Sequence, residues 1–139
     1  MTTVSRLIDH FVPEHYQLFI DLDRNNRTFR GKVTLTGSLV ATDSPIILHA
    51  KDLTLTAATI DNQPATISPS DNDEVSLSIE DLSSGTHTLS VDFSGSINDQ
   101  MHGLYPCYFE HNGSQKELLA TQFESHHARE VFPCIDEPA

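Results

Sequence analysis

Two polar side chains near the C-terminus, Gln122 and Glu124, have the spacing in this chain that is most suggestive of chemistry. The segment from Leu118 to Glu124 alternates in character, and residues two apart on a strand share a face. We therefore expect an amide and a carboxylate side by side, a pair suited to hydrogen bonding and charge recognition. From this pattern alone, a polar sheet face in water is the more common explanation.

Motifs typical of a catalytic centre are absent from the sequence. It contains no Gly-rich phosphate loop, no C-x-x-C and no G-x-S-x-G. Eight histidines are present, but the adjacent His126 and His127 lack the H-E-x-x-H spacing that puts two rings on one helix face. Adjacent histidines in a turn are more often solvated, so we expect no catalytic residue and no metal ligand in this chain.

The elements that must position Gln122 and Glu124 are strands, because apolar residues recur with a period of two almost everywhere. Asn112-Gly113 is a strong hairpin signal, and Gly31 and Gly37 suggest a bend or a close backbone approach. Helical turns are expected only near Ser125 to Val131 and near the N-terminus. The strands are predicted at residues 16–22, 29–41, 46–49, 53–60, 65–67, 75–79, 89–93, 104–110 and 116–124.

Short strands separated by frequent turns predict an all-β fold of antiparallel sheets, either a sandwich or a strongly curved sheet. The 139 residues are enough for a single domain with one core. Two prolines, Pro133 and Pro138, lie close together near the end and cannot continue a helix or a central strand. We therefore expect the chain to end in a stiff, extended connector, as a piece of a longer protein would.

The charge of the chain is strongly negative, at −12, and no Lys or Arg occurs between Asp52 and Gln115. Such a surface repels phosphate backbones, so a nucleic-acid partner is not expected. The acidity favours solubility as its main role, with attraction of cationic substrates or a basic partner as the alternative.

The location of the protein is expected to be cytoplasmic, without a membrane partner. No segment approaches the ~20 apolar residues that span a bilayer, and the N-terminus has no signal-like apolar run. Cys107 and Cys134 are the only cysteines, and we interpret both as reduced thiols, with Cys134 buried. The alternative is a single disulfide bond, which would need an oxidising compartment.

One family resembles this chain over nearly its whole length. The runs Ala120-Thr121-Gln122-Phe123-Glu124, Ala128-Arg129 and Phe132-Pro133-Cys134-Ile135-Asp136-Glu137-Pro138-Ala139 resemble the aminopeptidase N-like zinc aminopeptidases of the gluzincin class. Weaker agreement in order and spacing is found at residues 13–18, 29–33, 47–50 and 103–105.

The resemblance implies that residues 1–139 are the N-terminal β-domain, a saddle-like arrangement of sheets that docks on a catalytic domain. In that family, Glu124 would bind the free α-ammonium group of a peptide and Gln122 would contact its first residue. The α-amino group of an unstructured peptide has a pKa of about 7.7–8.0, so it is mostly cationic at neutral pH. Holding that group at a fixed distance from a metal would select the first peptide bond.

The family's zinc ligands and catalytic base are not found in these residues, because no H-E-x-x-H occurs. Zinc is therefore expected in the full-length parent, a metallo-aminopeptidase acting on peptides with a free N-terminus, and the chain alone is expected to be inactive. The resemblance also predicts an apolar docking surface near residues 118–138. The alternative is a non-enzymatic β-sandwich that serves as a binding or interaction module.

Overall fold

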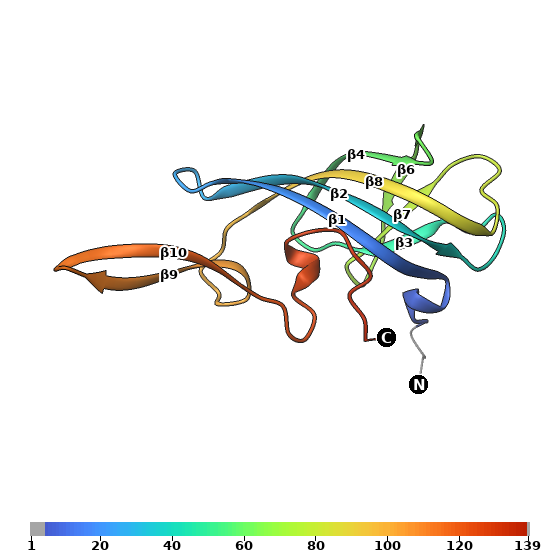
Figure 1. The fold of residues 1–139 in the computed structure, drawn as a ribbon. Helices are drawn as coiled ribbons and strands as arrows, with labels where there is room; N and C mark the ends of the chain where they lie inside the picture. The colour runs from blue at the N-terminus through green and yellow to red at the C-terminus, as the bar shows by residue number, and fades with distance from the viewer. Residues whose placement is uncertain (1–4, 139) are drawn as a thin grey trace.

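Antiparallel sheets and two short 3-10 turns are the regular elements of the structure, a computed structural model that describes residues 5–138 (Figure 1). The all-β prediction is therefore confirmed. The 3-10 turns are η1 (Leu7–Asp9) and η2 (Ala128–Glu130). The strands are β1 (Phe11–Asp23), β2 (Thr28–Leu39), β3 (Ile46–His49), β4 (Thr54–Ile60), β5 (Gln63–Pro64), β6 (Thr66–Pro69), β7 (Glu74–Ser78), β8 (Gly85–Ser96), β9 (Gly103–His111) and β10 (Ser114–Gln122).

The main sheet has the strand order β1-β2-β8-β4-β5, and a smaller sheet of order β3-β7-β6 contributes to the same core. Alternation explains this packing, since every second residue of β2 and β8 points inward. The core side chains include Val33, Leu35 and Leu89 from the main sheet and Leu48 and Leu77 from the smaller one. Burial of these apolar residues supplies most of the driving force for folding.

Close approach of two strands explains why position 31 is a glycine, as the sequence suggested. A Cβ atom added at Gly31 would lie 2.3 Å from the carbonyl oxygen of Phe19 and 2.8 Å from the ring of Phe93. No ordinary side chain fits such a gap without displacing the backbone. The glycine therefore allows β1 and the Phe93 ring to pack directly on β2.

A two-stranded hairpin of β9 and β10, which we call the arm, extends away from the main sheet (Figure 1). Its turn is the predicted one, because Asn112 and Gly113 both have positive φ angles, of 52° and 76°. Two arginines of the β1–β2 turn hold the arm from the side. Arg27 lies 2.7 Å from the Glu117 carboxylate and Arg24 lies 3.4 Å from it.

The last described residues, 132–138, form what we call the tail segment, and they pack on the body of the domain. Cys134 and His49 form an isolated antiparallel bridge, with N···O distances of 2.7 and 3.1 Å. The Glu137 carboxylate accepts hydrogen bonds from the backbone N–H groups of Leu7 and Ile8 at the start of η1. The tail segment is thus tied both to β3 and to the beginning of the chain.

Each predicted strand overlaps an observed one, and β3 has the predicted bounds, but β1 and β8 are several residues longer than predicted and the short β5 was not predicted. One difference concerns the site, because β10 ends at Gln122 rather than at Glu124. Cys134 is buried as expected, and neither cysteine is in a disulfide bond. No helix among the described residues is long and apolar enough to cross a membrane.

Candidate functional site

Gln122 and Glu124 lie where β10 leaves the arm and turns back toward the body. Gln122 is the last residue of β10 and pairs with Gly103, the first residue of β9. The Glu124 backbone N–H donates a 3.0 Å hydrogen bond to Oε1 of Gln122. The two side chains are exposed, and the part of the chain that the structure describes offers the Glu124 carboxylate no hydrogen bond or ion pair. The carboxylate is thus available to a ligand.

An aromatic contact chain fixes the backbone around Glu124. The Phe123 ring packs edge-on against Phe132 at a centroid distance of 6.1 Å, and Phe132 packs in the same way against Tyr16 at 6.2 Å. Such edge-to-face pairs add about 0.5–1.5 kcal/mol each beyond burial. Phe123 is only partly buried, but it packs against the core.

Tyr16 completes this contact chain at the tail segment. Its hydroxyl oxygen accepts a 3.0 Å hydrogen bond from the Ile135 N–H. Burial raises the pKa of Tyr16 to about 12, although the hydrogen bond from Ile135 opposes this shift. The phenol therefore remains neutral at physiological pH and serves as a structural link between β1 and the tail segment.

Arg129 holds the turn after Glu124 to the tail segment by charge. Its Nε lies 3.1 Å from Oδ2 of Asp136, and its side chain is 12% exposed. Arg129 also lies 3.6 Å from the carboxylate of Asp73, and its backbone carbonyl accepts a hydrogen bond from the Lys51 N–H. The Ala-Arg and Asp-Glu-Pro motifs therefore support the backbone that carries Glu124.

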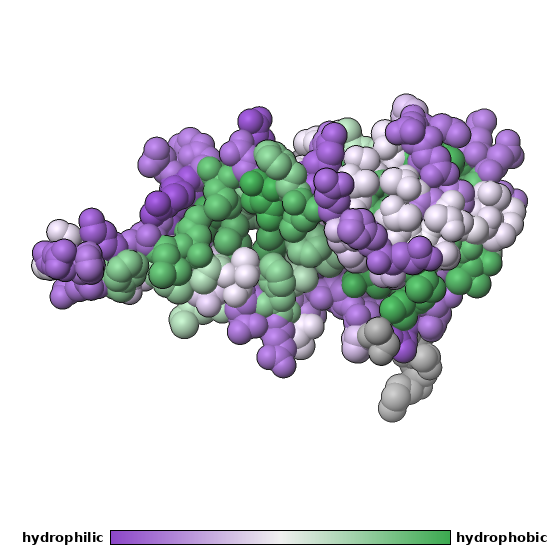
Figure 2. All heavy atoms as spheres, viewed as in Figure 1, coloured by the Kyte–Doolittle hydropathy of each residue, from purple (hydrophilic) through white to green (hydrophobic). Residues whose placement is uncertain are grey.

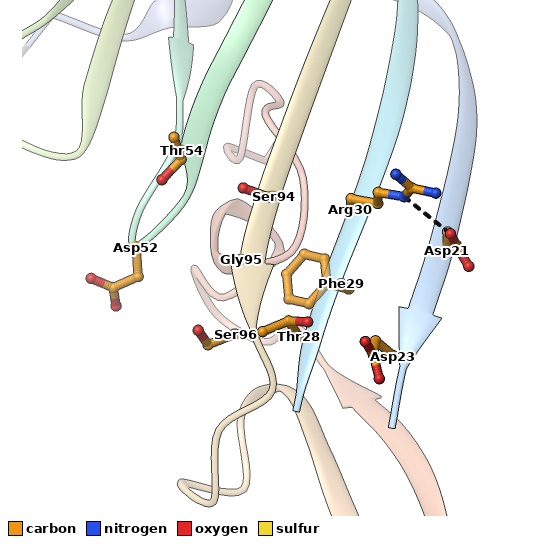
Figure 3. Close-up of a pocket in the computed structure, with 10 residues that line it drawn as sticks. All are labelled: Asp21, Asp23, Thr28, Phe29, Arg30, Asp52, Thr54, Ser94, Gly95 and Ser96. Atoms are coloured by element: carbon orange, nitrogen blue, oxygen red, sulfur yellow. Dashed lines mark hydrogen bonds and ion pairs between the residues drawn. The ribbon is translucent and has the colours of Figure 1, made fainter. Parts of the chain in front are cut away.

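A separate hollow of about 560 Å³ lies between the ends of strands of the main sheet (Figure 3). Its side chains include the ion-paired Arg30 and Asp21, 3.1 Å apart, and Asp52 at a turn (Figure 3). None of its lining residues belongs to the segment 118–138. The hollow therefore does not contain either of the two residues that the sequence selected.

Three side chains that sequence reasoning did not connect also meet near this site. His102, His127 and Glu130 each place one candidate ligand atom within 4.8 Å of the others. His127 and Glu130 are three residues apart on one turn, but His102 is distant in sequence and comes from the loop before β9. Only the fold brings the third residue to the other two.

Comparison with known proteins gives this geometry its context. Residues 12–139 match the family described as the peptidase M1 N-terminal domain. The chain belongs to this family. Its resemblance to aminopeptidase N-like enzymes, noted from the Gln122–Glu124 and tail motifs, is thereby confirmed.

Individual relatives agree with the family assignment. The chain is 46% identical over 137 residues to an aminopeptidase N of Lactococcus lactis subsp. lactis and 38% identical over 135 residues to one of Lactobacillus delbrueckii subsp. lactis. It is 36% identical over 145 aligned positions to aminopeptidase M1 of Arabidopsis thaliana. These alignments cover 96–98% of this chain and 16% of each relative.

Proposed function

We propose that this chain is the N-terminal substrate-capping domain of a zinc-dependent aminopeptidase, which removes N-terminal residues from peptides. The observation that carries the proposal is the exposed Glu124 carboxylate on a backbone fixed from both sides. In this role Glu124 binds the α-ammonium group of the peptide, and Gln122 contacts the first residue. A charge-assisted hydrogen bond of this kind is stronger than a neutral one.

The zinc chemistry of the proposed parent enzyme would come from outside these residues, because H-E-x-x-H does not occur here. Bound zinc would activate water and polarise the scissile carbonyl. The residues of this chain would position the substrate. An ammonium group held by Glu124 limits how far the peptide enters, which would restrict cleavage to the first bond.

The arm supplies a surface through which the domain would contact the rest of its parent. Leu118 and Phe109 are 47% and 45% exposed, and their strand register puts them on the same face of the hairpin. Figure 2 shows hydrophobic residues over the arm and the adjacent part of the main sheet, whereas the tip of the arm is hydrophilic. An exposed apolar patch of this kind favours an interaction surface.

The test is kinetic and uses the full-length parent with Glu124→Gln. Loss of a hydrogen bond to a charged group costs about 1.5–3 kcal/mol, so kcat/KM for peptides with a free amine should fall roughly ten- to hundredfold. Peptides with an acetylated N-terminus should be affected much less. Glu110→Gln, on β9 of the same arm, is the matched control. Equal kinetic constants for the Glu124 and Glu110 variants would rule out the assigned role.

A further inference from the structure

Two imidazoles converge on one carboxylate oxygen at the base of the arm, and the proposed function does not use them. Nδ1 of His102 lies 3.0 Å from Oε2 of Glu130, and Nδ1 of His127 contacts the same oxygen. The rings of His102 and His127 are stacked, with centroids 4.1 Å apart and planes 25° apart. Stacking therefore holds both Nδ1 atoms beside a single oxygen atom.

The Glu130 carboxylate lies in a place where an anion needs a cation. Its side chain is only 6% exposed, whereas the two histidines are 27% and 20% exposed. Among the described residues, the ion-pairing partners of Glu130 are these histidines, and neither Lys nor Arg approaches it. Taking an ionised carboxylate out of water is costly unless it is paired or coordinates a metal. A divalent cation held by the same three side chains would neutralise this charge.

We propose that His102, His127 and Glu130 form a binding site for a divalent transition-metal ion, with zinc as the best-suited ion. Two imidazole nitrogens and one carboxylate are a donor set that zinc accepts, with water in the fourth position. Imidazole ligands favour zinc, copper and nickel, whereas calcium and magnesium prefer oxygen ligands. This proposal departs from the expectation, drawn from the adjacent His126 and His127, that the chain holds no metal.

The positions of the ligand atoms require only small adjustments. Zinc–ligand bonds of about 2.0–2.2 Å place the ligand atoms of a tetrahedral site roughly 3.3–3.6 Å apart. The 3.0 Å separation between His102 and Glu130 is close to that value, and no pair of candidate ligand atoms exceeds 4.8 Å. His127 would move away from Glu130 slightly, because the ion would replace the proton between them.

A bound ion would fasten the base of the arm from both of its strands. His102 immediately precedes the first residue of β9, and His127 follows Glu124 by three positions. The His127 N–H already donates a 2.9 Å hydrogen bond to the Phe123 carbonyl. Within the described residues neither ligand histidine has a hydrogen-bond partner at Nε2, so outer-shell support is weak and we expect moderate affinity.

The experiment is a zinc titration of the 139-residue chain in competition with a chromophoric zinc chelator. One saturable equivalent is expected, accompanied by a rise in thermal unfolding midpoint. Loss of a partner beyond the ligands themselves weakens metal sites about 10–100-fold, so His102→Ala and Glu130→Gln should each weaken binding by at least about tenfold. His126→Ala is the matched control, since His126 stacks on His127 but is not one of the three ligands.

Either the intact chain or the variants can overturn the proposal. Absence of saturable zinc binding by the intact chain does so directly. Binding that survives both His102→Ala and Glu130→Gln, or that is lost in His126→Ala alone, assigns the ion to other residues and also overturns it. Far-UV circular dichroism without metal verifies that each variant is folded, and His102→Ala affects a partly exposed side chain. The experiment measures zinc binding and not peptidase activity, so a negative result would not affect the proposed role of Glu124.

Discussion

The backbone N–H of Asp136 donates a 3.0 Å hydrogen bond to Nδ1 of His49. The backbone of the same histidine forms the bridge to Cys134, so main chain and side chain of one residue hold the tail segment. An imidazole nitrogen accepts a hydrogen bond only when it carries no proton. His49 therefore supports the tail segment in its neutral form.

Acidification should weaken the domain through His49. Burial, followed by the Arg129 charge, lowers the pKa of His49 below its ordinary value, against the opposing effect of nearby carboxylates such as Glu137. The unfolded-state pKa of about 6.5 is then the higher one. The stabilisation is complete above that pH and is lost as the pH falls through the folded-state value. Urea unfolding of the chain at a series of pH values between about 7 and 5 measures this loss.

A variant isolates the contribution of His49 from that of other titrating groups. In His49→Asn, Oδ1 can accept the same hydrogen bond and does not titrate. The stability of this variant should depend less on pH over the same range. An unchanged slope, equal to that of the intact chain, would contradict the assignment.

Removing the Glu137 carboxylate should destabilise the N-terminal turn. It accepts hydrogen bonds of 3.0 and 3.1 Å from the N–H groups of Leu7 and Ile8. Leaving buried donors unsatisfied costs about 1–3 kcal/mol in the free energy of unfolding, so Glu137→Ala should lose that much. Glu137→Gln should lose less, because one amide oxygen still accepts. Chemical denaturation measures the free energy of unfolding of these variants. Glu80→Ala, at an exposed position, is the control and should change that free energy little. Equal losses for Glu137→Ala and Glu80→Ala would refute the prediction.

Adding a single methyl group at Gly31 should strongly destabilise the fold. The added Cβ atom would lie 2.3 Å from the Phe19 carbonyl oxygen, which is backbone and cannot rotate away. Overpacking of this kind costs typically about 1–3 kcal/mol. We expect Gly31→Ala to lower the thermal midpoint clearly, whereas Ser94→Ala on the adjacent strand should have a small effect. A Gly31 variant as stable as the Ser94 variant would show that the strands separate more easily than their packing indicates.

The apolar face of the arm gives a prediction that depends on context. Leu118 is 47% exposed in this chain, so Leu118→Ser should change its stability by no more than about 0.5 kcal/mol. In the full-length parent the same side chain would be buried at the proposed contact, and burial of a leucine contributes about 1.5–3 kcal/mol. The substitution should therefore destabilise the parent more than the isolated chain. Equal effects in the two contexts, measured by thermal unfolding, would argue against docking through this face.

Local pattern predicted much of the fold but not every strand end. Alternation located β3, and the Asn112-Gly113 dipeptide located its turn, because both signals depend on neighbouring residues alone. The same alternation extended β10 by two residues. The chain turns after Gln122, and there the Gln122 side chain, in place of a partner strand, accepts the Glu124 N–H.

Contacts between distant segments were the part that sequence could not supply. The pairing of His102 with His127 and Glu130 joins residues on two different elements, and no spacing rule connects them. The role of Glu137 at η1 likewise links the two ends of the described chain. For Gln122 and Glu124, the family resemblance supplied the functional meaning, and the strand pattern supplied only their proximity.

The arm shares no β-ladder with either of the other sheets in the part of the chain that the structure describes. Its base packs on the core through Leu104 and Leu119, whereas its outer half is held by side chains such as Arg24, Arg27 and Glu117, which lie at or near the surface. Surface charge pairs weaken as ionic strength rises, whereas the packed core does not respond in this way. The outer half of the arm is thus held more loosely than its base, and a charge substitution at Glu117 would let it swing while Gln122 and Glu124 stay in place beside the packed aromatic side chains.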